Sequence, residues 1–400
     1  NNITWVTTAY GGVVKLVENE GFQSMGRNAS LYDIKANLNV HSLYVEDSSF
    51  WLGTLSSGLY IGDNGENLMN ATELSDLKIN TIYRKNNLIY VGTQKGLHIY
   101  DRNTLKRIFV DENLNKISAI FIDSHDNLIL GTQQRGLMIV KGGKFRDKTA
   151  YTSYRDSEDK QHKLESDRIT SIVEDNQGNI WIGTYNGVHL FDPRKEIFYH
   201  QSQFLEGQLP SVIINNLLPD TDYLWLGTPG GLIKTKYRDK RLQIVEEYTS
   251  DRGLSNDFIN AMTLDAQDNL WFTNQLEIVR LSPNGEIVSF GELNGVTTTS
   301  FNLRSCFNFN NETIYFGGSD NVVFFNPETI GKMQATSEVI LTNLKVNNKL
   351  VTAGEVVNGE VILDKDFSYV DKIELTHKDK LFSIGSMLAT TVEPAERGMG

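Results

Sequence analysis

Residues 178–192 read GNIWIGTYNGVHLFD, which predicts two short strands joined by a tight turn. Apolar residues dominate both halves, and Asn186-Gly187 provides the residue types that accept positive φ in a two-residue hairpin loop. A single two-stranded hairpin is marginally stable at best in water. The stretch therefore needs partner strands from elsewhere in the chain.

The same pattern recurs along the chain, and the recurrence sets the architecture. All five tryptophans of the chain fall in one hydrophobic slot of the repeat, which is occupied in turn by Trp5, Trp51, Tyr90, Ile129, Trp181, Trp225, Trp271 and Tyr315. The six intervals between Trp51 and Tyr315 average 44 residues, a period typical of four-stranded propeller blades. Helical periodicity is nearly absent, so the fold is predicted to be all-β.

The repeats predict a β-propeller over residues 21–330. The bulky residue in each slot would be buried between neighbouring sheets, and the glycine that follows leaves room for an adjacent backbone. Seven copies from Trp51 to Tyr315 predict a seven-bladed ring, in which residues 21–33 could supply the missing outer strand of the last blade. Residues 1–20 are interpreted as a leftover blade of an upstream propeller; an eight-bladed ring that includes them is the alternative.

The pattern changes after Pro327. Residues 337–388 read as alternating strands at a shorter spacing, with turn residues at Asn347-Asn348 and Asn358-Gly359. They predict a small Ig-like β-sandwich over residues 337–400. The tail TTVEPAERGMG loses the alternation, so the sandwich is expected to be incomplete.

Composition limits the classes of partner. The 400 residues carry a net charge of −12, which argues against nucleic acid binding because phosphate recognition needs a basic face. Cys306 is the single cysteine, so no disulfide can form within the chain, and we expect it to be a small buried apolar residue. No run of about 18 apolar residues occurs, so we expect membrane attachment only through segments outside this chain.

No set of residues predicts catalysis or metal binding. The seven histidines are scattered, and the HExxH, CxxC, GxSxG and Walker patterns are absent. His98 and His189 share one strand position, two residues after a turn glycine, which favours packing over metal ligation. Turns such as Asp123–Asn127 lack the later Gly and Glu of an EF-hand. We therefore expect no catalytic residue, no metal and no cofactor.

A carbohydrate site needs aromatic rings for apolar sugar faces, amides for hydroxyl groups and guanidinium groups for acidic substituents. The longest interval between slots, 52 residues from Ile129 to Trp181, contains an insertion at residues 148–168. Loops that join the second and third strands emerge on one face nearby. The candidate ligand-binding residues are Gln133, Gln134, Arg135, Tyr151, Tyr154, Arg155, Tyr185 and Asn186. A solvated insertion that binds nothing is the alternative.

The repeat resembles the two-component regulator propeller repeat, through the pattern Asp-x-x-Gly-Asn-[Ile/Leu]-Trp-[Ile/Phe]-Gly-Thr and through Gly-Leu-Ser-Asn at 253–256. The stretches VILTNLKVNNKLV (339–351) and KIELTHKDKLFSI (372–384) resemble the start of the triple-tyrosine domain that follows such propellers. Residues 395–400, where the namesake tyrosines of that domain would lie, read AERGMG instead.

The resemblance implies the periplasmic portion of an inner-membrane hybrid histidine-kinase sensor of the kind that Bacteroidetes use to detect glycans. It implies an oligosaccharide ligand, a homodimeric parent protein, and signalling to the transcription of polysaccharide-utilisation genes. The chain itself is then not an enzyme. Two other classes stay open: a propeller lyase or hydrolase that acts on polysaccharide, and a protein-interaction scaffold.

Overall fold

The computed structural model describes residues 4–8, 12–16, 21–26, 32–33, 38–46, 49–63, 68–156, 164–238, 241–330, 334–365, 367, 370, 372–377 and 379–393. The chain forms two compact units. One is Gly21–Glu328, and the other combines Asn1–Glu20 with Thr329–Gly400.

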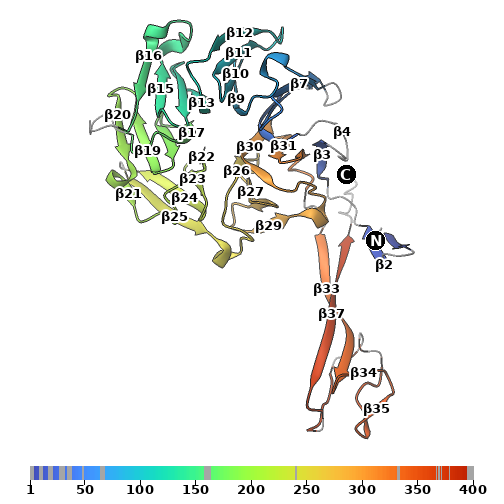
Figure 1. Ribbon diagram of the computed structural model, residues 1–400. Coiled ribbons are helices and arrows are strands. Elements are labelled where there is room, and N and C mark those ends of the chain that lie inside the picture. The colour runs from blue at the N-terminus through green and yellow to red at the C-terminus, as the bar shows by residue number, and fades with distance from the viewer. Residues whose placement is uncertain are drawn as a thin grey trace, which may run out of the picture. The chain divides into compact units, whose positions relative to one another are not determined.

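Seven sheets make up the described part of Gly21–Glu328 (Figure 1), five of them with four strands and two with five. The first three sheets contain β5 (Val40–Glu46), β6 (Ser49–Thr54), β7 (Leu59–Asp63) and β8 (Met69–Asn70); β9 (Ile79–Lys85), β10 (Leu88–Thr93), β11 (Leu97–Asp101) and β12 (Arg107–Asp111); β13 (Ile117–Ile122), β14 (Leu128–Thr132), β15 (Leu137–Val140) and β16 (Tyr151–Tyr154).

The next three sheets contain β17 (Ile169–Glu174), β18 (Ile180–Thr184), β19 (Gly187–Asp192) and β20 (Ile197–His200); β21 (Leu205–Glu206), β22 (Asn216–Pro219), β23 (Leu224–Thr228), β24 (Gly231–Arg238) and β25 (Arg241–Tyr248); β26 (Ala261–Leu264), β27 (Leu270–Thr273), β28 (Ile278–Leu281) and β29 (Ile287–Phe290). The seventh contains β30 (Phe301–Phe309), β31 (Thr313–Gly318), β32 (Asn321–Phe325), β3 (Gln23–Gly26) and β4 (Tyr32–Asp33). Short 3-10 helices occur at Thr72–Leu74, Lys141–Gly143, Lys148–Ala150, Gln201–Gln203, Ser250–Arg252 and Glu292–Asn294.

The sheets close into a ring. One strand of each sheet lies innermost and contacts the innermost strands of both neighbouring sheets, in the order β5, β9, β13, β17, β22, β26, β30 and back to β5. Figure 1 shows most of these strands around the centre of the disc. The prediction of an all-β propeller is confirmed.

Ring closure uses a strand from the beginning of the unit. Strand β3 pairs antiparallel with β32, with Gln23 opposite Phe324 and Met25 opposite Val322. Residues 21–33, which the sequence analysis considered as the source of a missing strand, supply β3 and β4 here. The last sheet is thereby completed by residues that are about 300 positions away in the sequence, so the two ends of the ring hold each other.

The repeated Trp-x-Gly-Thr segment has a role in packing. Trp51, Trp181 and Trp271 are fully buried and Trp225 is 5% exposed. A Cβ added to the repeat glycine would lie only 2.5–3.0 Å from an isoleucine at or just before the start of the next innermost strand, which applies to Gly53, Gly92, Gly131, Gly183 and Gly227. The threonine hydroxyl donates to the carbonyl of the turn glycine at 2.8–3.1 Å in Thr54, Thr93, Thr132, Thr184 and Thr228. The motif therefore allows close contact between sheets and fixes the turn.

A set of side-chain hydrogen bonds joins six of the seven pairs of neighbouring sheets near the start of their innermost strands; between β5 and β9 the Ile82 amide instead donates to the Ser42 hydroxyl at 2.7 Å. We call this set the polar belt. Each member donates to a backbone carbonyl of the next sheet at 2.6–3.1 Å; the members are Asn80, Ser118, Thr170, Asn215, Asn260 and Asn302, and their acceptors are Ile117, Ile169, Ile214, Ile259, Phe301 and Val40. Each bond satisfies a carbonyl at a sheet interface.

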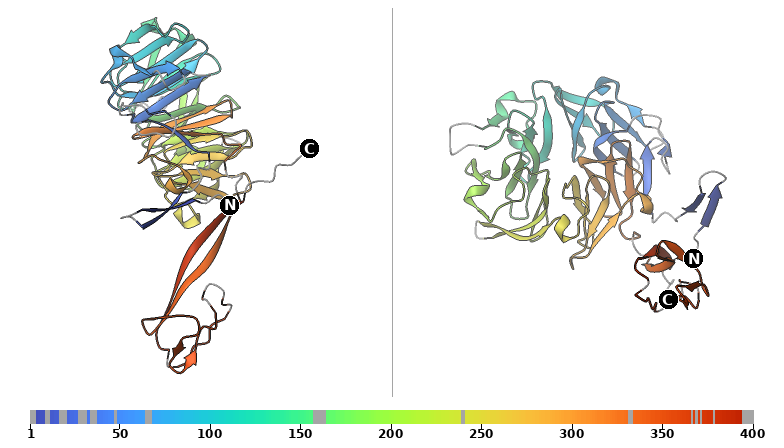
Figure 2. Two further views of the ribbon diagram at one scale, coloured as in Figure 1. Left: turned by 90° about the vertical axis from the view of Figure 1, so that its right-hand side faces the viewer. Right: turned by 60° about the horizontal axis from the view of Figure 1, so that its bottom comes forward.

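The second unit is built around one long ribbon. Strand β33 (Gln334–Val346) pairs antiparallel with β37 (Phe382–Glu393), and β34 (Lys349–Val351) pairs with β33. Hairpins form from β35 (Val356–Val357) with β36 (Glu360–Val361), and from β1 (Thr4–Thr8) with β2 (Gly12–Leu16). Figure 2 gives two further views of the sheets and the ribbon. A small core contains Leu344, Val346, Val351, Leu363 and Phe367.

The alternating strands predicted over residues 337–388 do not run through this whole range, because the described residues between Val361 and Phe382 form no strand. Asp379 accepts hydrogen bonds from Thr376 and from the Asn358 amide, which folds this stretch into a turn instead. The β-sandwich and the leftover blade at residues 1–20 stay predictions, and residues 395–400 lie outside the described part. None of the described helices is both long and apolar enough to cross a membrane.

Candidate functional site

A central cavity of about 540 Å³ lies among the innermost strands of the ring. All seven sheets contribute to its wall, for example through Ser42, Asn80, Ser118, Thr170, Asn216, Met262 and Arg304. Concave spaces of this size are typical of small-ligand sites. The cavity has two ends, and the charged groups at these ends differ.

At the end where strands β5 and β9 finish, the charged side chains are paired. Glu46 accepts from Arg84 at 3.2 Å and from Arg102 at 2.8 Å. Lys85 lies 3.7 Å from Asp126. This end therefore carries little uncompensated charge.

At the other end, three consecutive innermost strands are each preceded by a basic residue. Lys78 comes directly before β9, Lys116 before β13 and Arg168 before β17, and Arg304 on β30 reaches into the cavity beside them. We call these four residues the basic mouth. In the part of the chain that the structure describes, none of the four forms an ion pair with a carboxylate.

Backbone hydrogen bonds place the second-to-third-strand loops beside three of these cations. The amide of Gln94 donates to the carbonyl of Lys78 at 3.2 Å, that of Gln133 to Lys116 at 2.9 Å, and that of Tyr185 to Arg168 at 3.2 Å. The Arg168 guanidinium also lies 3.8 Å from the centroid of the Tyr185 ring. Each of these three sheets therefore places a basic residue next to a residue with either an amide or an aromatic side chain.

Arg304 reaches the cavity because strand β30 bulges. Phe301 pairs with Gly318 and Cys306 with Phe316, so four intervening residues face one on the partner strand. Arg304 has a φ of 59° in this bulge. Its Nη1 donates to the carbonyl of Thr170, on β17, at 2.9 Å. The guanidinium therefore extends from one innermost strand to another.

Burial and neighbouring positive charges lower the pKa values of Lys78, Arg304 and His41. Burial lowers the pKa of Lys78, and the charges of Arg304 and Arg168 lower it further. Burial also lowers the pKa of Arg304; Tyr185 opposes this shift, and the nearby charge of Arg168 reinforces it. His41, at the start of β5, has its pKa lowered to about 4 by burial and by the charges of Lys78 and Arg304. Nearby positive charge thus disfavours the charged forms of Lys78, Arg304 and His41.

Five of the candidate ligand residues lie in the two loops at this end of the ring. Gln133 and Tyr185 stand directly beside the basic mouth, and the Gln133 amide oxygen lies 3.4 Å from the Gln94 nitrogen. Gln134 accepts a hydrogen bond from the Lys116 ammonium group. Arg135 donates to the carbonyl of Asn113 at 3.1 Å, and Asn186 to the carbonyl of Glu165 at 3.3 Å.

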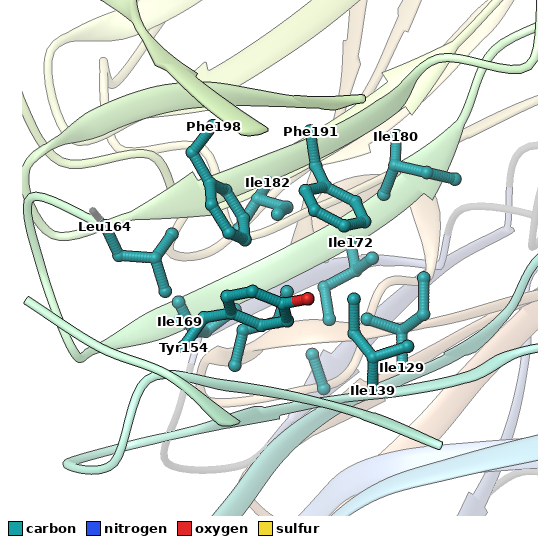
Figure 3. Packing of buried hydrophobic residues seen from close by; sticks show 12 residues of the cluster. Ile129, Ile139, Tyr154, Leu164, Ile169, Ile172, Ile180, Ile182, Phe191 and Phe198 are labelled. Carbon is teal, nitrogen blue, oxygen red and sulfur yellow. The ribbon is translucent and has the colours of Figure 1, made fainter. Parts of the chain in front are cut away.

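The other three candidates belong to the outer strand β16 or follow it. Tyr154 is 6% exposed, and Figure 3 shows its ring packed among Ile129, Ile139, Phe191 and Phe198. The partly buried Tyr151 donates to the carbonyl of Phe145 at 2.7 Å, and Arg155 is exposed. The Tyr154 ring therefore has no free face for a sugar. Residues 157–163 of the insertion lie outside the described residues.

The basic mouth was not predicted from the sequence. A signal was present, because a basic residue precedes the first isoleucine of three successive blades in LKINTI, NKISAI and DRITSI. Only the structure shows that these three positions lie at the same end of neighbouring innermost strands, near Arg304, which lines the cavity. Arg304 gave no signal, since a four-residue bulge is not visible in an alternating pattern.

The packing role predicted for two histidines is confirmed. His98 is 3% exposed and His189 is fully buried, and burial lowers their pKa values to about 4 and about 3. Cys306 is only partly buried, because it lines the central cavity, and burial raises the pKa of its thiol to about 12. Among the described residues, no group of three or more His, Cys, Asp or Glu side chains is placed to hold a metal ion.

The fold defines a β-propeller with a basic end to its central cavity. Residues 163–186 match the family model of the two-component regulator propeller, so the chain carries a repeat of that class. This confirms the resemblance of the repeat to the two-component regulator propeller.

Two further proteins are similar to this chain over more than nine-tenths of its length. The chain is 24% identical over 392 residues to histidine kinase P4 of Formosa agariphila, a match that spans 92% of this chain and 28% of that protein. A crystal structure assigned to the extracellular domain of the hybrid two-component system BT3049 of B. thetaiotaomicron has a TM-score of 0.74 at 22% identity, covering 96% of this chain and 51% of that one. The chain thus spans less than a third of the length of the curated relative.

A streptogramin B lyase has the same fold, with a TM-score of 0.58 at 10% identity, and covers 76% of this chain and 97% of its own. Likeness at this level concerns the fold alone. Propellers of similar shape therefore include both sensors and enzymes, and the side chains of the site have to distinguish them.

Proposed function

We propose that this chain is the ligand-sensing region of a hybrid two-component sensor, exposed outside the cytoplasmic membrane, and that its ligand is an oligosaccharide. The match to the two-component regulator propeller and the names of the two relatives support the sensor assignment. The observation that carries the ligand assignment is the central cavity, whose basic mouth is bordered by the amides of Gln94 and Gln133 and by the ring of Tyr185.

The parent protein would act as a homodimer and control the transcription of polysaccharide-utilisation genes. A ligand changes the balance between two signalling states only to the extent that it binds them with different affinity. The closed ring suits this role, since a rigid disc can hold a binding surface while the chain beyond it responds.

The cavity does not favour the hydrolase alternative. Polysaccharide hydrolysis requires two carboxylic groups that face one bond. Among the described residues that line the cavity, Glu46 is the one carboxylate, and it is held by Arg84 and Arg102. The four residues of the basic mouth are cations that donate hydrogen bonds, whereas His41 beside them is held neutral and is the group there that could accept a proton.

Isothermal titration calorimetry on this chain tests the proposal. The panel contains neutral, uronic-acid-containing and sulfated oligosaccharides, and each recovered ligand is checked by mass spectrometry. We expect saturable binding of at least one ligand, which is recovered intact. Binding of none of them, or recovery of shortened products, would contradict the proposal.

A further inference from the structure

Arg304 has more hydrogen-bond donors than the protein uses. A guanidinium carries five N–H groups. In the part of the chain that the structure describes, its side chain makes one hydrogen bond, to the carbonyl of Thr170. The remaining donors border the central cavity, which Arg304 lines. A partly buried cation in this situation requires acceptors that come from outside the protein.

The two ends of strand β9 differ in whether their basic side chains have carboxylate partners. Lys85, at one end, has Asp126 as a partner, and the neighbouring Arg84 has Glu46. Lys78, at the other end, has no carboxylate partner among the described residues. The chain has a net charge of −12, so carboxylates are abundant, yet the basic mouth carries four cations without one. A site that binds an anion needs this charge to remain uncompensated.

The groups that border the cations fit a saccharide. The side chains of Gln94 and Gln133 lie at hydrogen-bond distance from each other and can exchange this bond for sugar hydroxyls. The Tyr185 ring, stacked on Arg168, provides an aromatic surface at the same rim. The site thus combines donors for an oxyanion with amide and aromatic groups.

We infer that the ligand is an anionic oligosaccharide whose sulfate or carboxylate group binds at the basic mouth, between Arg304 and Lys78, with Arg168 beside it. The inference rests on the sensor function proposed above and specifies the chemical class of its ligand. Guanidinium groups bind such oxyanions through two parallel hydrogen bonds, and Lys78 contributes a point charge. Binding an anion also relieves the mutual repulsion of the cations.

The test compares three matched ligands by calorimetry: a sulfated oligosaccharide, its desulfated form, and an oligosaccharide that carries a uronic acid. The variants are Lys78→Gln, Arg168→Gln and Arg304→Lys. The control is Lys85→Gln, which removes the same charge from the opposite end of the same strand. Thermal unfolding of each variant shows whether it is folded.

We expect a charged ligand, either sulfated or carboxylated, to bind at least about tenfold more tightly than the neutral form, because charge-assisted hydrogen bonds contribute this much or more. Lys78→Gln and Arg168→Gln should each weaken that binding by about tenfold, whereas Lys85→Gln should leave it unchanged. Higher salt should weaken the binding of the charged ligand.

Two results would overturn the inference. If the neutral form binds as tightly as the charged forms and the variants have no effect, the chain senses a neutral saccharide, and the proposed function stands without this specificity. If Lys85→Gln weakens binding as much as Lys78→Gln, the effect reflects net charge rather than the basic mouth. Absence of all binding would instead contradict the proposed function itself.

Discussion

Arg304 and Thr170, which are 134 positions apart in the sequence, are joined by a hydrogen bond of 2.9 Å from the Arg304 guanidinium to the Thr170 carbonyl. The Thr170 hydroxyl in turn donates to the carbonyl of Ile214 at 2.6 Å. Thr170 therefore links the polar belt, which holds the ring together, to the cation that we place in the ligand site. Stability and binding can be tested separately at these two residues.

Replacing Thr170 by valine should destabilise the propeller by about 1–3 kcal/mol. Valine matches the size of threonine, but it leaves the buried carbonyl of Ile214 without its donor. Urea-induced unfolding measures the effect. Thr221→Val is the control, because Thr221 is exposed and its hydroxyl makes no hydrogen bond in the described structure. Equal midpoints for the two variants would mean that the belt does not stabilise the ring.

Ring closure by β3 predicts different costs at two methionines. Met25, on β3, is fully buried between β32 and the core of the first sheet, whereas Met69, on β8, is 74% exposed. We expect Met25→Ala to cost about 2–5 kcal/mol, the usual range for a buried methionine, and Met69→Ala to cost less than about 0.5 kcal/mol. Thermal and urea unfolding measure both. A small effect at Met25 would argue against closure through this strand.

Two tryptophans in the same slot should respond differently to replacement by phenylalanine. The indole nitrogen of Trp181 donates to Asp175 at 2.8 Å, whereas that of Trp225 is buried without a partner in the described structure. Trp181→Phe loses a hydrogen bond to a carboxylate, but Trp225→Phe removes an unsatisfied donor. Trp181→Phe should therefore be the more destabilising by about 1–3 kcal/mol. Denaturant titrations measure the free energy of unfolding of both variants. A larger loss for Trp225→Phe than for Trp181→Phe would contradict this prediction.

The buried histidines should make the protein less stable as the pH falls from about 6.5 to about 4. His98 and His189 have pKa values of about 4 and about 3 when folded, below the usual 6.5 of the unfolded chain. The unfolded state therefore takes up protons first in this range, so acid favours unfolding.

The variant that tests this pH dependence is His189→Gln, which should reduce the loss of unfolding free energy between pH 6.5 and pH 4.5. His125→Gln, at an exposed turn, should leave that loss unchanged. Denaturant titrations at several pH values supply the measurement. An unchanged pH dependence in His189→Gln would show that this histidine is not held neutral by burial.

Much of the fold could be predicted from the sequence, because the residues that determine it are local and repeated. The Trp-x-Gly-Thr segment marks the second strand of a blade, and its spacing marks the repeat. The site was harder to predict for two physical reasons. Residues 148–168 read as an insertion, whereas Tyr151–Tyr154 form the outer strand β16 and the Tyr154 ring packs in the core. The bulge that brings Arg304 into the cavity breaks the register on which alternating patterns depend.

The most direct measurement of the central claim is a crystal structure of this chain with a bound sulfated oligosaccharide, in which the anomalous signal of sulfur locates the sulfate group. The account predicts a sulfate at about 3 Å from the Arg304 guanidinium, within reach of Lys78. A sulfate held at the opposite end of the cavity, near Glu46, or at the rim outside the ring would contradict it.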